Sequence, residues 1–258
     1  RDPARLMPRF RMLLEYDGEP FVGWQRQDNG PSVQAALEDA IDGFCGESVA
    51  VTAAGRTDAG VHALGQVCHF DLVRDATPNT VRDAVNAHLR PAPIAVVEAV
   101  VADPDFHARF DAIRRRYIYR IVNRRAPLAL DCGHAWRVPQ PLDAEAMAEG
   151  AKALLGYHDF SSFRTRQCQA KSPEKTLDRL DVQRLGESVE VRAEARSFLH
   201  HQVRIMVGTL AQVGLGKWRL RDVAGALAAK DRAAAGPTAP PEGLCLMGVD
   251  YPSSSAAR

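Results

Sequence analysis

The residues best suited to chemistry lie in one octapeptide, Gly-Arg-Thr-Asp-Ala-Gly-Val-His, at positions 55–62. Its carboxylate, Asp58, has Arg56 two residues before it and Gly60 two residues after it. Gly55 and Gly60 permit backbone angles that other residues resist, so the loop can bend tightly around the carboxylate. A carboxylate removed from water stays ionised only with help, which a guanidinium can give. The alternative is a polar turn in which Asp58 caps its own backbone.

Two further segments carry candidate side chains. Tyr117 and Tyr119 share one face of an expected strand, because side chains alternate along a strand. An aromatic ring near an ionised Asp can stack on a base, although for any one tyrosine packing against neighbouring strands is the more common role. Arg204 lies among apolar residues of an expected helix. A buried Arg needs a carboxylate partner, and Asp58 and a structural salt bridge elsewhere are equal alternatives.

A third segment, Gly23-Trp24-Gln25-Arg26-Gln27, follows the first expected strand. Trp24 and Arg26 together could grip RNA, but a Trp in such a place is more often a plug in the core. His62 and His107 each stand without a partner nearby in the sequence. We therefore expect structural, hydrogen-bonded roles for both histidines.

Composition bounds the class of protein. A chain of 258 residues, 46% hydrophobic and 25% charged, can form one large domain or two small ones. No apolar run is long enough to cross a bilayer, and the first ten residues lack a signal-peptide core. We expect a cytoplasmic protein. The five cysteines are odd in number and widely spaced, which predicts reduced, mostly buried thiols and no metal site.

The net charge of +1 favours no particular partner, but most of the 33 basic residues are Arg. Arginines cluster at 114–116, at 124–125, and at Arg164 and Arg166. Guanidinium groups suit phosphate forks and base stacking. Coding bias explains these clusters as well as nucleic-acid binding does.

The expected elements of the first half run β-α-β-β-α-β, which is the ferredoxin-like order. Ser32 and Gly46 look like the caps of the first helix. Residues that alternate or recur at helical spacing predict strands over 9–17, 49–53, 66–71 and 94–101, and helices over 33–44 and 79–89.

The second half repeats this order. We expect strands over 113–122, 177–184, 188–195 and 244–251, and helices from Asp143 to Leu155, over 198–213 and over 219–229. The fold class is therefore α+β: two ferredoxin-like (β-α-β-β-α-β) halves joined into one extended, mostly antiparallel sheet, with helices on one side and a central cleft. The expected divisions are a tail at 1–8, an N-terminal half at 9–102 that carries Asp58, a C-terminal half at 103–251 and a flexible tail at 252–258.

Thirteen short segments together resemble one family. They cover nearly everything from Arg9 to Tyr251, and in this order they resemble the pseudouridine synthases related to tRNA pseudouridine synthase A. The segments are 15–18, 23–27, 32–34, 54–62, 65–67, 106–110, 115–117, 159–160, 162–164, 203–204, 207–208, 228–232 and 242–244.

The resemblance implies conversion of uridine to pseudouridine at positions 38, 39 and 40 in the anticodon stem-loop of tRNA, with no cofactor. It makes Asp58 the nucleophile, which attacks C6 of the base or C1′ of the ribose, or removes a ribose proton. These three routes stay open.

The resemblance also implies roles for further residues. Arg56 would fill the space left by the flipped base or hold the flipped nucleotide, Tyr117 would stack on the uracil, and Arg204 would keep Asp58 ionised. Leu244 would pack against the flipped base. Arg26 and Arg164 would contact the RNA. Family members are homodimers in which one tRNA touches both subunits; no membrane and no other protein partner are implied.

Two other classes of protein fit the sequence less well. A glycoside hydrolase would need a second carboxylate to act as the acid, and the octapeptide holds only one. A non-catalytic RNA-binding protein would carry an aromatic RNA-binding signature on its strands, which the sequence does not show.

Overall fold

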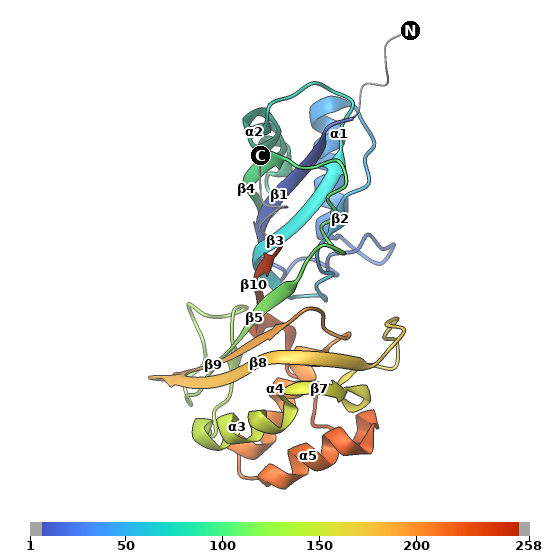
Figure 1. The fold of residues 1–258 in the computed structure, drawn as a ribbon. Helices are drawn as coiled ribbons and strands as arrows, with labels where there is room; N and C mark the ends of the chain where they lie inside the picture. Colours follow the sequence, from blue (N-terminus) through green and yellow to red (C-terminus); the bar gives the residue numbers. More distant parts are fainter. Residues whose placement is uncertain (1–6, 253–258) are drawn as a thin grey trace. The chain divides into compact units, whose positions relative to one another are not determined.

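The computed structural model describes residues 7–252, and the chain divides into two compact units (Figure 1). The first unit contains described residues 7–113 and 246–252, and the second contains residues 114–245. Most of the two expected tails, residues 1–6 and 253–258, lies outside the described residues. Within the described residues, no helix has the length and apolar character that crossing a membrane requires.

The first unit is an open sheet with two helices on one face (Figure 1). Its strands follow the order β4-β1-β3-β10, and β2 pairs with β3. β1 runs antiparallel to both β3 and β4. The elements are β1 (Arg9–Tyr16), α1 (Val33–Cys45), β2 (Thr52–Ala53), β3 (His62–Asp71), α2 (Pro78–Leu89), β4 (Ile94–Val101) and β10 (Leu244–Asp250), whose first two residues belong to the second unit.

The second unit is also an open sheet covered by helices (Figure 1). Its strands follow the order β5-β9-β8-β7 with antiparallel neighbours, and β6 adds a short parallel pairing to β5. The elements are β5 (Arg114–Val122), β6 (Trp136–Arg137), α3 (Ala144–Ala151), β7 (Gly156–Asp159), β8 (Glu174–Leu185), β9 (Ser188–Ala195), α4 (Gln202–Gly214) and α5 (Leu220–Ala229), with 3-10 turns at Lys152–Leu154, Ser161–Phe163, Arg232–Ala234 and Pro241–Gly243.

The α+β class with a mostly antiparallel sheet is confirmed. The description of two ferredoxin-like halves with a cleft stays a prediction. In the first helix, the Ser32 side chain accepts the backbone N–H of Ala35, and Gly46 ends the helix at a φ of 72°. Both caps are where the sequence predicts them.

The core of each unit fixes the sheets that carry the candidate residues. In the first unit, Phe10, Met12 and Leu14 alternate along β1 and are fully buried, and the ring of Phe10 stacks on Phe70 of β3 at 5.9 Å. This packing holds β1 and β3 together, and the 54–61 loop leads into the start of β3.

The expectation of mostly buried thiols is wrong. Of the five free cysteines, Cys68 is buried, Cys132 is exposed, and the remaining three are half-buried. Cys68 sits on β3 between buried neighbours, and burial raises the pKa of its thiol.

Candidate active site

Asp58 lies in a short loop that joins β2 to β3. The backbone of Gly23 and Trp24, from an earlier segment of the same chain, holds this loop. The residue is half-buried, whereas Arg56 is exposed. Asp58 forms an isolated antiparallel bridge with Gly23, and the N–H of Trp24 donates to the carbonyl of Thr57 at 3.0 Å. The carbonyl of Asp58 accepts from Val61 at 3.2 Å, which closes a turn after the carboxylate.

A chain of buried polar groups fastens the other side of the loop. The side-chain amide of Gln66 is fully buried; it accepts from the N–H of Gly55 at 3.3 Å and donates to the carbonyl of Gly55 at 2.7 Å. The same nitrogen donates to the hydroxyl of Tyr16 at 3.3 Å, and that hydroxyl shares a 2.8 Å hydrogen bond with Thr57. Residues on both sides of Arg56 are therefore fixed to the sheet.

Tyr16 and Gln66 were missed as site residues by sequence reasoning. Both fall inside segments that carry the family resemblance, but that pattern gives neither residue a role. The contacts of Tyr16 with Thr57 and with Gln66 join positions 41 and 50 residues apart, which no local pattern reveals.

Gly23 and Trp24 pack directly against the Asp58 loop. Gly23 has a φ of +116°, and a Cβ at this position would lie 2.8 Å from the carbonyl oxygen of Thr57. Trp24 is buried, with its ring 6.3 Å from that of Tyr16. Trp24 is therefore the core plug that was one of the two alternatives for it.

The segment 106–110 is anchored to the same sheet. Arg9 pairs with Asp71 through two hydrogen bonds of 2.7 and 2.8 Å, and it also donates to the carbonyl of Phe106 at 2.8 Å. The Nδ1 atom of His69 accepts from the N–H of Ala108 at 3.1 Å. Burial lowers the pKa of His69 to about 4, so the ring is neutral at neutral pH and can accept this bond.

His62 and His107 make structural hydrogen bonds, as expected. Nδ1 of His62 accepts from the N–H of Gly18 at 3.0 Å. Nδ1 of His107 accepts from the N–H groups of Arg109 and Phe110 at 3.2 and 3.3 Å.

In the second unit, Tyr117 and Tyr119 share the buried face of β5, as the alternation predicts. The ring of Tyr117 meets Phe198 edge-on at 5.3 Å, and 9% of the residue stays exposed. Tyr119 is fully buried and donates to the carbonyl of Pro240 at 2.7 Å, so it serves the core. Burial raises the pKa of its hydroxyl.

The other candidates of the second unit are held by α4 and the segments near it. Arg204 is half-buried; its Nε donates to the carbonyl of Ala239 at 2.8 Å, and its own carbonyl accepts from the N–H of Ala239 at 3.0 Å. Leu244 is buried at the start of β10, and Arg164 is half-buried after the turn at Ser161–Phe163. The pairing of Arg204 with Asp58 stays a prediction.

The predicted site residues thus fall into two groups. The first unit carries Arg26, Arg56 and Asp58, and the second carries Tyr117, Arg164, Arg204 and Leu244. A hollow of about 710 Å³ lies elsewhere in the second unit, between the start of α3 and the end of α4. None of these described residues lines it.

Comparison with known proteins identifies the family. The family model described as tRNA pseudouridine synthase matches residues 12–111 and 151–252. The tRNA pseudouridine synthase A of Paramagnetospirillum magneticum (strain AMB-1) is 64% identical over 248 residues, which is 96% of this chain and 97% of that protein. The synthase of the same name from Methylocella silvestris is 62% identical over 95% of this chain and 99% of that protein. That from Nitrobacter winogradskyi is 60% identical over 98% and 99%. The chain therefore belongs to the tRNA pseudouridine synthase family, whose members are isomerases that act on tRNA.

Proposed function

We propose that this chain isomerises uridine to pseudouridine at positions 38, 39 and 40 in the anticodon stem-loop of tRNA, with Asp58 as the nucleophile. The observation that supports this most is the fixed backbone around Asp58. Buried Gln66 and Tyr16 hold the residues before the carboxylate, and Gly23 bridges Asp58 itself. A carboxylate on such a loop needs little reorganisation to meet a substrate atom, which is the main requirement of positioned catalysis.

The reaction exchanges one bond of the nucleoside for another. The bond from N1 of uracil to C1′ of the ribose breaks, the base turns, and a bond from C5 to C1′ forms. N1 gains a proton and C5 loses one, so atoms and electrons balance without a co-substrate. Asp58 attacks C6 of the base or C1′ of the ribose, or it removes a ribose proton; all three routes suit a single carboxylate.

The target base must leave the helical stack before a carboxylate can reach it, at a cost of about a few kcal/mol. Arg56 is exposed and two residues from Asp58, which suits a side chain that fills the vacated space or holds the flipped nucleotide. The family resemblance supports stacking of Tyr117 on the uracil, pairing of Arg204 with the carboxylate, packing of Leu244 on the base and phosphate contact by Arg164. Arg26 is set apart from this group because its guanidinium already pairs with two carboxylates.

The resemblance and the composition of the chain support three further proposals. The enzyme acts as a homodimer in which one tRNA touches both subunits. It works in the cytoplasm, and it needs neither a metal ion nor an organic cofactor.

The test is to map pseudouridine in tRNA after incubation with the purified protein. The parent should modify positions 38 to 40, whereas Asp58→Ala should form no pseudouridine and keep its tRNA affinity. Asp83→Ala, which removes an exposed carboxylate from α2, is the matched control and should keep full turnover. Turnover by Asp58→Ala would refute the nucleophile, and a parent protein that binds tRNA but forms no pseudouridine would favour the non-catalytic alternative.

A further inference from the structure

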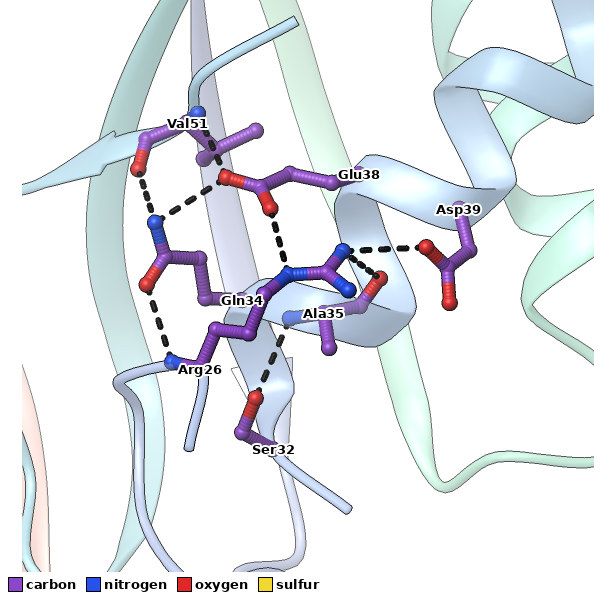
Figure 2. A network of polar contacts seen from close by, with 7 residues as sticks. All are labelled: Arg26, Ser32, Gln34, Ala35, Glu38, Asp39 and Val51. Atoms are coloured by element: carbon purple, nitrogen blue, oxygen red, sulfur yellow. Dashed lines mark hydrogen bonds and ion pairs between the residues drawn. The ribbon is translucent and has the colours of Figure 1, made fainter. Parts of the chain in front are cut away.

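Glu38 of α1 connects three parts of the first unit (Figure 2). Its side chain is only 14% exposed. One carboxylate oxygen accepts from the N–H of Val51 at 3.1 Å and from the side-chain amide of Gln34 at 2.9 Å. The other oxygen accepts from Nε of Arg26 at 3.0 Å. Both oxygens are therefore committed inside the protein.

Gln34 lies one helical turn before Glu38 and completes the network (Figure 2). The side-chain oxygen of Gln34 accepts from the backbone N–H of Arg26 at 3.1 Å, and its side-chain nitrogen donates to the backbone carbonyl of Val51 at 3.2 Å. The two side chains thus satisfy both backbone groups of Val51 and the backbone N–H of Arg26.

Val51 and Arg26, the two positions anchored by Glu38 and Gln34, lie next to the two segments that support the Asp58 loop. Val51 immediately precedes β2, whose end leads into the loop. Arg26 follows Trp24, whose N–H donates to the carbonyl of Thr57. The first turn of α1 also binds this segment, since the N–H of Gln34 donates to the carbonyl of Trp24 at 2.9 Å. A shift of Glu38 would therefore move both supports of the loop.

The positive charge of the Arg26 guanidinium is already balanced by carboxylates of the same unit. It pairs with Glu38 through Nε and with Asp39 through a terminal nitrogen at 3.0 Å, and these two bonds raise its pKa. Two carboxylates face one guanidinium, so the local charge is negative. A phosphate approaching this point would meet repulsion, which argues against a phosphate contact at Arg26.

We propose that Glu38, Gln34 and Arg26 form a positioning cluster for the Asp58 loop, and that Arg26 acts through this cluster and does not bind tRNA phosphate. This inference rests on the proposed function for its effect on rate. It predicts a loss in the chemical step with tRNA affinity retained.

The kinetic test compares Arg26→Ala, Gln34→Ala and Glu38→Gln with the parent. Each should lower the single-turnover rate at saturating tRNA about tenfold or more, because small misplacements of reacting groups are costly. The Kd for tRNA should stay within about twofold, with an unchanged salt dependence. The double variant of Arg26 and Glu38 should be no slower than the slower single variant, since both substitutions remove the same contact between these two side chains. Arg82→Ala is the matched control, because this Arg of α2 also pairs with a carboxylate, Asp83, and it should leave the rate unchanged.

An Arg26→Ala protein with weaker tRNA binding, a salt slope reduced by about one and a normal saturated rate would overturn the proposal in favour of a phosphate contact. Additive losses in the double variant would also overturn it.

A second measurement needs no activity. Hydrogen exchange of the RNA-free protein should show faster exchange in peptides that cover residues 51–61 in Glu38→Gln, with no change in Arg82→Ala. Glu38→Gln is nearly isosteric and is expected to fold, which its unfolding midpoint checks. Unchanged exchange would refute the positioning role. A parent protein that forms no pseudouridine would refute the proposed function alone, because the exchange result still decides whether the cluster holds the loop.

Discussion

At the scale of single residues, the proposed carboxylate depends on neighbours that need never touch the substrate. Tyr16 and Gln66 reach the loop from β1 and β3 and hold Thr57 and Gly55. The reactive residue itself is recognisable in the sequence, because its octapeptide is local and distinctive. Its supports are not, because their hydrogen bonds join residues that come together only after the sheet has formed.

Tyr117 is the residue at which stacking and proton transfer can be separated. Tyr117→Phe should bind tRNA normally, since the ring is kept, whereas Tyr117→Ala should lose about 1–3 kcal/mol of base stacking. If the hydroxyl takes the C5 proton, Tyr117→Phe should also accumulate an enzyme-bound intermediate after the N–C bond breaks. Single-turnover assays with both variants measure these effects.

Tyr119→Phe is the matched control for Tyr117. Its hydroxyl serves the carbonyl of Pro240, so its removal should cost about 0.5–1.5 kcal/mol of stability and cause no stalled intermediate. An unchanged rate and affinity in Tyr117→Ala would assign Tyr117 to core packing against Phe198.

At the scale of elements, Gly23 is the point where the segment after β1 lies in close contact with the Asp58 loop, at Thr57. Gly23→Ala should destabilise the protein by about 1–3 kcal/mol through its positive φ. It should also slow pseudouridine formation about tenfold or more, because the new methyl group would push Thr57 and the loop away. Thermal unfolding and single-turnover rates check the two effects.

Gly186 provides the comparison for Gly23. It has a φ of +62° in the turn between β8 and β9, and a Cβ there meets nothing within 4 Å. Gly186→Ala should therefore cost about 1–2 kcal/mol of strain and leave the rate unchanged. Equal rates in the two variants would show that the approach of Gly23 to Thr57 has no catalytic consequence.

His69 should make stability depend on pH. Its folded pKa is about 4 against an ordinary value of 6.5, so the unfolded chain binds more protons between these limits. The contribution of neutral His69 to the free energy of unfolding is complete above pH 6.5 and is lost as the pH falls toward 4. The positive charge of Arg9 opposes its protonation, while the negative charges of Asp71 and Asp111 favour it.

The measurement is the unfolding free energy from pH 7.5 to 4.5. His69→Asn keeps an acceptor for the N–H of Ala108 and cannot titrate, so its profile should be flatter than that of the parent. His88→Asn, at an exposed position of α2, should keep the parent's profile. A parent profile already flat between pH 6.5 and 4.5 would contradict the buried neutral state.

Element boundaries show what local pattern can and cannot predict. The strand Ile94–Val101 follows from its apolar run, and the caps of α1 follow from their capping residues. The helix expected from residue 198 begins instead at Gln202, because His201 has a φ of +63°, outside the helical region. The short strands β6 and β7 were not expected, since two to four residues are too few to show a period.

At the scale of the whole molecule, family membership predicts the assembly. The mass in solution should be twice the 28.2 kDa of one chain. Sedimentation equilibrium at several concentrations measures this directly, with and without tRNA. A mass of one chain at all concentrations, with full activity, would contradict the dimer.

The last strand gives the fold a consequence for biosynthesis. β10 lies beside β3 in the sheet of the first unit, and a Cβ on Gly65 would lie 2.4 Å from the carbonyl oxygen of Met247. On the ribosome, residues up to 113 emerge long before residues 246–252. β2 covers β3 only at Cys68 and His69, so the part of this edge that β10 pairs stays open until β10 is made. An exposed strand edge invites pairing with other chains. A chain truncated before β10 would therefore be prone to aggregation, although every residue of the Asp58 loop had already been made.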